Sequence, residues 1–248
     1  MTDRLGYRLK IGIIIPSTNT TVQPETDSMR PAGVTNHVGR IHIPDLPLTS
    51  DTEFEAMVEA IGPDLFGAVD RVMTCKPDRL VMAMSIPTFW GGKAGSDALL
   101  ARMEARAGVP VSMGSAACVE ALQCFPKVRR IGILTPYQPV GDAHVARYFA
   151  DHGYEVALVH SLKRPSEVQI AHATEADIRD GLKTLAAAGV DAIVQAGTDL
   201  AVTDIADEAE RWLGLPVIAI NAATYWHALR HAGIADKVTG RGMLLATH

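Results

Sequence analysis

The stretch that decides the fold is IGIIIP at residues 11–16, because it recurs as IGILTP at residues 131–136, 120 positions later. Two further pairs follow in the same order: DRLV at 78–81 with DAIV at 191–194, and GVPV at 108–111 with GLPV at 214–217. Their offsets are 113 and 106 residues. Three matches in one order indicate a duplicated unit. We therefore predict two pseudo-symmetric lobes with a cleft between them.

Each copy is expected to hold four strands. Short runs rich in Val and Ile alternate with stretches of helical periodicity, a pattern typical of βαβ units and a mostly parallel sheet. Strands are expected at residues 10–15, 37–43, 79–84, 109–113, 130–134, 155–160, 192–195 and 216–220, and helices at 52–73, 96–107, 115–123, 141–151, 175–187, 204–213 and 223–231. The predicted class is α/β, two four-stranded sheets flanked by helices. Residues 1–117 and 217–248 are assigned to the first lobe, and residues 118–216 to the second.

Composition narrows the class of protein. The chain has 248 residues, of which 48% are hydrophobic and 21% charged, as in globular domains. A net charge of −5 offers no basic footprint for nucleic acid. The first apolar run ends at Pro16, too short for a signal-peptide core or a membrane span. Three cysteines without a CxxC pair fit a reducing compartment. We predict a cytoplasmic protein that binds neither nucleic acid nor membrane; association of identical copies is left open.

Cofactor and metal signatures are absent from the sequence. It contains no G-x-G-x-x-G fingerprint, P-loop or G-x-S-x-G elbow. His227 and His231 are four residues apart on one expected helix face, but no third ligand has a plausible spacing. We therefore predict neither cofactor nor metal, and interpret the two histidines as a structural or solvated pair.

Polar side chains follow the first strand of each copy. Ser17 and Asn19 come after the first strand of the first copy. In the second copy, Thr135 lies at the end of the corresponding strand and Tyr137 comes after it. Ligands of parallel sheets bind beyond the carboxyl ends of the strands, so both lobes are expected to present donors to one cleft. We predict that these four residues bind a carboxylate. The alternative for residues 17–21 is an ordinary turn that caps a helix.

The third strand of each copy supplies the candidate chemistry. Met84 corresponds to Gly197, Ser85 to Thr198 and Ile86 to Asp199. Met84 and Gly197 are expected to line the substrate site. Asp199 is the ionisable side chain expected at the centre of the cleft, where it would act as a general base. The alternative is that its carboxylate caps the next helix.

The sequence at residues 13–21, 130–137 and 213–217 resembles the aspartate/glutamate racemase superfamily, specifically its maleate isomerase and arylmalonate decarboxylase branch. The resemblance covers nearly the whole chain. It implies chemistry by cysteines at the two equivalent strand ends: racemases use both, the isomerases use one as a nucleophile, and the decarboxylases keep one in the second lobe. Those positions fall here on Met84 and Gly197.

Two functions from different classes follow from this resemblance. The first is a cofactor-independent isomerase, racemase or decarboxylase acting on a small carboxylic acid, with Asp199 and Ser85 or Thr198 in place of thiolates. The second is a non-catalytic carboxylate-binding or regulatory protein. Cys75, Cys118 and Cys124 match no catalytic position and are expected to be buried, with Cys118, near a helix start, as the one candidate to line the site.

Overall fold

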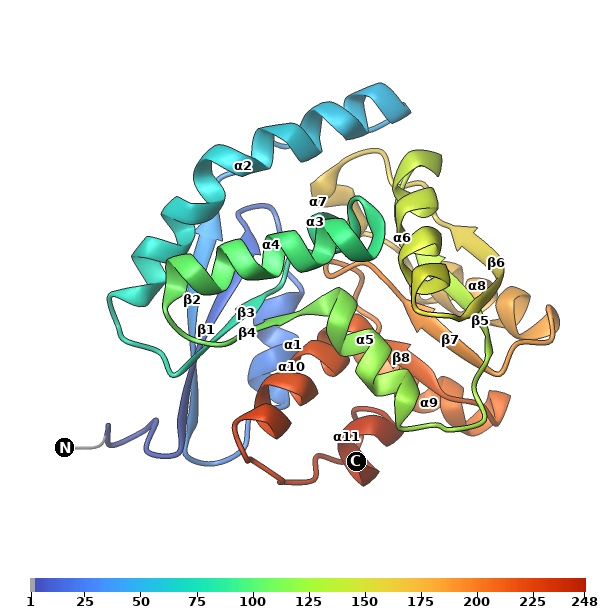
Figure 1. The fold of residues 1–248 in the computed structure, drawn as a ribbon. Coiled ribbons are helices and arrows are strands. Elements are labelled where there is room, and N and C mark those ends of the chain that lie inside the picture. The colour runs from blue at the N-terminus through green and yellow to red at the C-terminus, as the bar shows by residue number, and fades with distance from the viewer. Residues whose placement is uncertain (1–2) are drawn as a thin grey trace.

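Two four-stranded parallel sheets form the centre of the computed structural model, which describes residues 3–248 (Figure 1). The first has the order β2-β1-β3-β4 and the second the order β6-β5-β7-β8. The strands are β1 Leu9–Pro16, β2 Val34–Ile41, β3 Arg79–Met82, β4 Val111–Met113, β5 Arg130–Thr135, β6 Glu155–Ser161, β7 Ala192–Gln195 and β8 Val217–Ala219. The repeated motifs form β1 and β5, which occupy equivalent places. The predicted fold class is confirmed.

Helices flank both sheets (Figure 1). All seven expected helices are present: α2 Asp51–Met73, α4 Gly92–Ala107, α5 Gly114–Gln123, α6 Pro139–Asp151, α8 Glu175–Ala187, α9 Thr203–Leu213 and α10 Ile220–His231. Four short helices lie outside the expected ranges, because fewer than eight residues give little periodicity: α1 Val22–Ser28, α3 Ser85–Phe89, α7 Glu167–Ile170 and α11 Met243–Thr247. Helix α1 is the one that the alternative for residues 17–21 requires. Within residues 3–248, none of these helices has the length and hydropathy needed to cross a bilayer.

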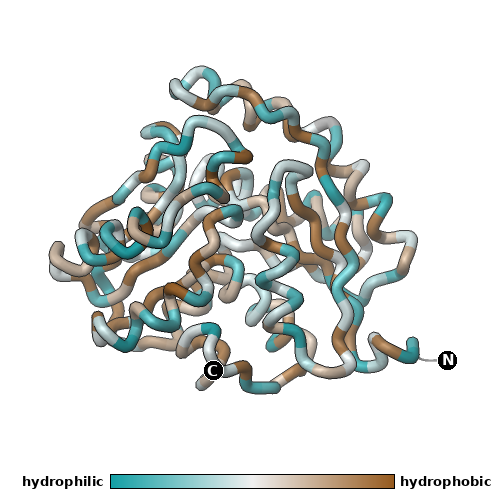
Figure 2. The backbone as a smooth tube through the Cα atoms, turned by 180° about the vertical axis from the view of Figure 1, so that it is seen from behind, coloured by the Kyte–Doolittle hydropathy of each residue, from teal (hydrophilic) through white to brown (hydrophobic). Residues whose placement is uncertain are grey.

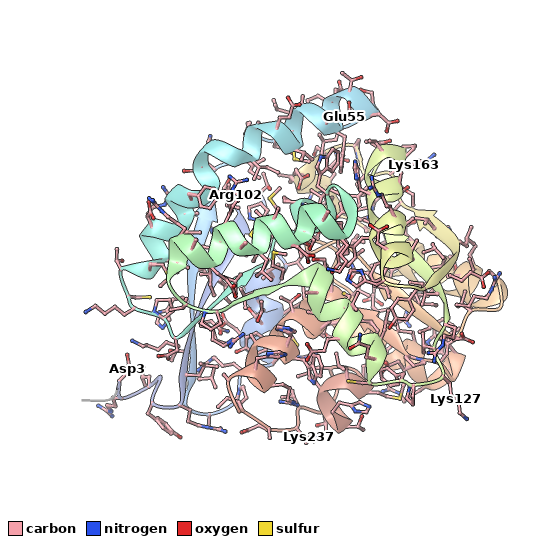
Figure 3. The ribbon with its side chains drawn as sticks, in the orientation of Figure 1. Asp3, Glu55, Arg102, Lys127, Lys163 and Lys237 are labelled. Carbon is pink, nitrogen blue, oxygen red and sulfur yellow. The ribbon has the colours of Figure 1, made fainter. Side chains whose placement is uncertain are left out.

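The buried hydrophobic core includes residues of β1, β3, β5 and β7. Hydrophobic segments of the chain are brown in Figure 2. Every residue of β3, β4, β7 and β8 is buried, which suits parallel strands covered on both faces. Charged side chains lie around the outside, including those labelled in Figure 3, namely Asp3, Glu55, Arg102, Lys127, Lys163 and Lys237. Polar groups that are buried inside the molecule therefore need a specific explanation.

The chain crosses between its two halves at β8 and α10. Because β8 pairs with β7, residues 217–219 belong to the second sheet, although the expected boundary falls just before them. Helix α10 follows directly but packs against α5 and against β4 of the first sheet. The division into lobes at residues 117 and 216 stays a prediction.

Phe54 links the halves through an aromatic contact. It is buried on α2, and its ring meets Tyr137 edge-on at a centroid distance of 5.6 Å. Phe54→Ala should lower the free energy of unfolding by about 3 to 5 kcal/mol in urea denaturation, because it opens a cavity at this contact. The exposed control Leu5→Ala should stay within about 0.5 kcal/mol of wild type. Equal effects of the two variants would contradict the prediction.

Candidate functional site

A narrow cavity lies where strands of both sheets end, and its empty space, counted together with the open solvent at its mouth, is about 290 Å³. Its lining combines hydroxyl, amide and carboxyl groups with apolar side chains: Pro16, Asn19, Met84, Ser85, Ile86, Tyr137, Glu167, Ile170, Gly197, Thr198 and Asp199. Seven of the nine residues predicted to form the site are among them. Equivalent strand ends of the two copies thus meet at one place, as expected for parallel sheets.

Ser17 and Thr135 are the two predicted residues outside this lining. Ser17 is exposed, and its Oγ is engaged by the backbone of Ile43, accepting from Ile43 N at 2.9 Å and donating to Ile43 O at 3.2 Å. The Thr135 hydroxyl donates to the carboxylate of Asp142. Burial raises the pKa of Asp142 to about 6. Both hydroxyls are therefore used in holding neighbouring segments.

Asn19 combines a structural bond with a free donor. Its Oδ1 accepts from the backbone N–H groups of Thr21 at 3.1 Å and Val22 at 2.9 Å, at the start of α1. Its Nδ2 is buried and has no hydrogen-bond partner among the described residues. An unsatisfied buried donor costs free energy, so an anion in the cavity would supply the acceptor that Nδ2 lacks. Asn19 can therefore cap α1 through Oδ1 and donate to an anion through Nδ2, so the two interpretations of this turn do not exclude each other.

The two oxygens of the Asp199 carboxylate have different surroundings. Oδ1 accepts from the backbone N–H groups of Thr20 at 2.9 Å and Thr21 at 3.1 Å, in the loop before α1. Oδ2 is buried and has no partner within residues 3–248. Burial raises the pKa of Asp199 to about 6, although the bonds from Thr20 and Thr21 oppose this shift. One oxygen therefore fixes the carboxyl group, and the other is free to exchange a proton near neutral pH.

Glu167 is a cavity residue that the sequence did not reveal. It is buried on α7, and burial together with the charge of Asp199 and Asp45 raises its pKa to about 7. The loop after β2 sets its place, because Pro47 bridges to Ser166 and Leu48 N donates to Pro165 O at 2.7 Å. The local signal is Ser166, whose side chain caps α7 by accepting from Gln169 N. A serine that caps a short helix is a common structural feature, so Ser166 gives no indication that the next residue, Glu167, lines a functional site.

Hydroxyl groups from the two halves meet beside the carboxyl pair. The Ser85 and Tyr137 hydroxyls form a hydrogen bond, and the backbone N–H of Thr198 donates to Ser85 Oγ at 3.2 Å. Burial raises the pKa of Tyr137 far above its ordinary value, so the phenol keeps its proton. Ser85, Tyr137 and Thr198 thus form one bonded group in the cavity wall that can donate to an anion.

No cysteine is among the described residues that line the cavity. Met84 and Gly197, each two residues beyond the end of β3 or β7, both line it. A Cβ on Gly197 would lie 2.6 Å from Pro136 Cδ, so this backbone approaches the end of β5 too closely for a side chain. Cys118 is buried within α5, where burial raises its pKa, and Cys124 is half-buried. Cys75 is exposed, because it lies in the turn after α2, and the expectation that it is buried was wrong.

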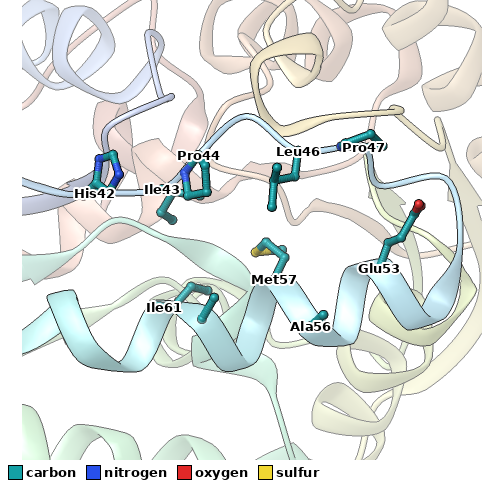
Figure 4. Close-up of a pocket in the computed structure, with 10 residues that line it drawn as sticks. His42, Ile43, Pro44, Leu46, Pro47, Glu53, Ala56, Met57 and Ile61 are labelled. Atoms are coloured by element: carbon teal, nitrogen blue, oxygen red, sulfur yellow. The ribbon is translucent and has the colours of Figure 1, made fainter.

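A larger apolar pocket lies between the loop after β2 and helix α2 (Figure 4). Its empty volume is about 690 Å³, and Ile43, Leu46, Met57 and Ile61 supply much of its wall. None of the residues predicted for the site lines it. The same loop holds the segment before Glu167, so the two hollows share one structural element.

Two parallel sheets of identical strand order, with a polar cavity where their strands end, define the class of protein. The chain belongs to the arylmalonate decarboxylase family, whose sequence model matches residues 11–245. A maleate isomerase from Pseudomonas putida is 26% identical over 245 residues, covering 96% of this chain and 97% of that protein. An arylmalonate decarboxylase from Bordetella bronchiseptica is 28% identical over 152 residues, covering 60% of this chain and 63% of that protein.

Solved structures show the same fold. A cysteine-to-serine variant of the maleate cis-trans isomerase from Nocardia farcinica, with a covalently bound succinylcysteine intermediate, superposes with a TM-score of 0.86. It is 21% identical, and the match covers 97% of this chain and 99% of that one. An arylmalonate decarboxylase superposes with a TM-score of 0.74 at 22% identity, covering 95% of this chain and 98% of that one. The resemblance to this branch of the superfamily is thereby confirmed.

Asn19→Ala and Tyr137→Phe should each weaken anion binding in the cavity. Each change removes a donor, and hydrogen bonds to charged groups contribute roughly 1.5 to 3 kcal/mol. The measurement is calorimetric titration with maleate and with phenylmalonate, and the matched control is Tyr7→Phe on an exposed tyrosine. Wild-type affinity in both cavity variants would place the anion elsewhere.

Proposed function

We propose that the protein is an enzyme that moves a proton at the carbon next to a carboxylate in a small carboxylic acid. Racemases, isomerases that shift a proton, and decarboxylases or related lyases all deliver a proton to an enediolate at this carbon. A cis-trans isomerisation would in addition require a nucleophile that adds to the double bond. The observation that carries the proposal is the pair Asp199 and Glu167, which line one cavity with pKa values raised to about 6 and about 7. Carboxyl groups that titrate near neutral pH are suited to both taking and giving a proton.

Substrate binding is assigned to the donors of the cavity. Asn19 Nδ2 lacks a partner among residues 3–248, and the Tyr137 phenol is held by Ser85. These groups would bind the substrate carboxylate. When the carbon loses its proton, negative charge spreads onto that carboxylate as an enediolate, and preorganised donors stabilise it. Met84 and Gly197 would border the bound molecule.

Proton transfer is assigned to the carboxyl pair. Asp199 Oδ2 accepts the proton as the C–H bond breaks, and its electron pair enters the enediolate. Protonated Glu167 then donates a proton to carbon and becomes the carboxylate. In a decarboxylation, the C–C bond to the leaving carboxylate breaks instead, carbon dioxide departs, and the enediolate takes up one proton. From the sequence, Ser85 or Thr198 was expected to act together with Asp199 in place of the thiolates. In the proposed route their role is to orient Tyr137, because Thr198 N donates to Ser85 Oγ and the Ser85 and Tyr137 hydroxyls are hydrogen-bonded.

The names of the relatives support this choice of substrate class. Maleate isomerase and arylmalonate decarboxylase both denote action on small carboxylic acids. A covalent cysteine intermediate is recorded for the Nocardia farcinica protein. In this chain the cavity wall offers carboxyl and hydroxyl groups, so the proposed route proceeds without a thiol and without a cofactor.

The second candidate is a carboxylate-binding protein without turnover. It is favoured by Asp199 Oδ1, which accepts from Thr20 and Thr21 as a structural cap would. Under this alternative the carboxyl group only joins the loop before α1 to the second half of the chain. Removing the basicity of Asp199 would therefore lower turnover if the protein is an enzyme and would leave the properties of a binding protein unchanged.

Asp199→Asn should lower turnover while leaving binding intact. The asparagine Oδ1 can still accept from Thr20 and Thr21, but the free position then carries an amide in place of a base. We expect turnover to fall by about 10² to 10⁴, as for a lost general base. The assay is deuterium uptake or product formation from maleate and phenylmalonate in D₂O, followed by NMR, with the exposed Asp180→Asn as control.

Binding is measured on the same variants by the shift in melting temperature that either acid produces. Full activity of folded Asp199→Asn would refute the role of Asp199 as base. A wild type that binds one of the acids but neither exchanges nor converts it would favour the binding protein.

The pH dependence follows from the two raised pKa values. Activity should rise with pH as Asp199 loses its proton near 6, and fall as Glu167 loses its proton near 7. We therefore expect a bell-shaped kcat/KM profile whose apparent values belong to the coupled pair. In Glu167→Gln, the residual activity should keep the rising limb and lose the falling one. A wild-type profile that is flat between about pH 5 and pH 8 would contradict the assignment.

A further inference from the structure

Helices α5 and α10 bring together three metal-ligating side chains away from the cavity. Glu120 comes from α5, and His227 and His231 come from successive turns of α10. Each offers a ligand atom, and these atoms all lie within 4.8 Å of one another. The two helices run beside each other in Figure 1 and pack together. The spacing of the histidines could not reveal the third ligand, because Glu120 lies more than one hundred residues earlier in the chain.

The distances between the ligand atoms fit a shared ion. Glu120 Oε1 lies 2.9 Å from His231 Nε2, and Glu120 Oε2 lies 3.4 Å from His227 Nε2. The imidazole rings are stacked, with centroids 4.0 Å apart and planes inclined by 14°, so both present Nε2 to the same carboxylate. Ligand atoms bonded at roughly 2.0 to 2.2 Å to one tetrahedral zinc ion lie roughly 3.3 to 3.6 Å apart. Small side-chain rotations would therefore suffice.

A second observation concerns the orientation of His227. The residue is 8% exposed, and its Nδ1 lies 2.8 Å from the Oγ of Ser112, which is buried in β4. When Nδ1 donates to Ser112, the ring holds the tautomer in which Nε2 carries the lone pair and faces Glu120. Such a partner behind the ligating imidazole is typical of protein metal sites, where it fixes the tautomer and the ring orientation.

We propose that Glu120, His227 and His231 bind one divalent transition-metal ion of the zinc type. Imidazole and carboxylate ligands suit this class of ion, and His231 and Glu120 are accessible enough for water to complete the coordination. Helix α5 follows β4 at the edge of the first sheet, and α10 follows β8 at the edge of the second. The ion would fasten together the two helices that leave these edge strands, and none of its ligands lines the cavity.

The test is calorimetric titration of the chelator-treated wild type with Zn²⁺, repeated with Co²⁺, whose visible spectrum reports the coordination geometry. We expect one Zn²⁺ per chain and a higher melting temperature in its presence. His231→Ala and Glu120→Gln should each weaken binding by at least about tenfold, and Ser112→Ala by about 10- to 100-fold, as for the loss of a supporting hydrogen bond. His42→Gln, on an exposed histidine elsewhere, should bind as the wild type does.

Circular dichroism establishes that each variant is folded; His231 and Glu120 are partly exposed, so their variants should keep the fold. Three results would overturn the proposal. The wild type could fail to bind one Zn²⁺, folded His231→Ala and Glu120→Gln could both bind as tightly as wild type, or His42→Gln could lose as much affinity as they do. In each case the contact between His231 and Glu120 would be an ordinary surface ion pair.

Discussion

Carboxylates that cross between the two halves of the chain hold the cavity in place. Asp199, after β7, accepts from the N–H groups of Thr20 and Thr21 before α1. In the other direction Glu25, on α1, accepts from Thr203 N at 3.1 Å at the start of α9 and from Asn221 Nδ2 at 2.7 Å at the start of α10. Asp199 thus satisfies two backbone N–H groups before α1, and Glu25 satisfies one at the start of α9, where backbone N–H groups lack partners within the helix.

This arrangement carries a thermodynamic cost that depends on pH. Burial raises the pKa values of Glu25, Asp199 and Glu167, so the folded state holds their protons more tightly than the unfolded chain does. The contribution of Asp199 and Glu167 to stability is complete below their unfolded pKa values near 4 and is lost as pH rises through about 6 to 7. Glu25 acts in the same direction. The chain is therefore less stable at the pH where a carboxylate base is available, as expected where active groups are held against their preferred ionisation.

The sequence predicted the fold and much of the cavity because both follow from backbone periodicity. The repeated motifs locate β1 and β5, and residues that follow parallel strands meet at one edge, so Asn19, Tyr137 and Asp199 line one cavity. The end of a strand, however, determines the position of the backbone but not the direction of the side chain. Thr135 therefore turned out to bond Asp142.

Residues placed by tertiary contacts left no periodic signal. Glu167 lies on a four-residue helix that the loop after β2 positions through Pro47 and Ser166. Glu120 lies beside His227 and His231 because α10 packs against α5. The sequence of neither helix indicates that the two helices are in contact. Both cases need the three-dimensional path of the chain, which depends on packing over long sequence separations.

The duplicated scaffold is symmetric, but the residues at its centre are not. Ile86 and Asp199 stand at corresponding places in the two copies, and both line the cavity. A flat, achiral intermediate in this cavity would meet the apolar Ile86 from one copy and the carboxyl groups of Asp199 and Glu167 from the other. Its two faces would no longer be equivalent, so a single hand of product could arise from a scaffold that is itself nearly two-fold symmetric.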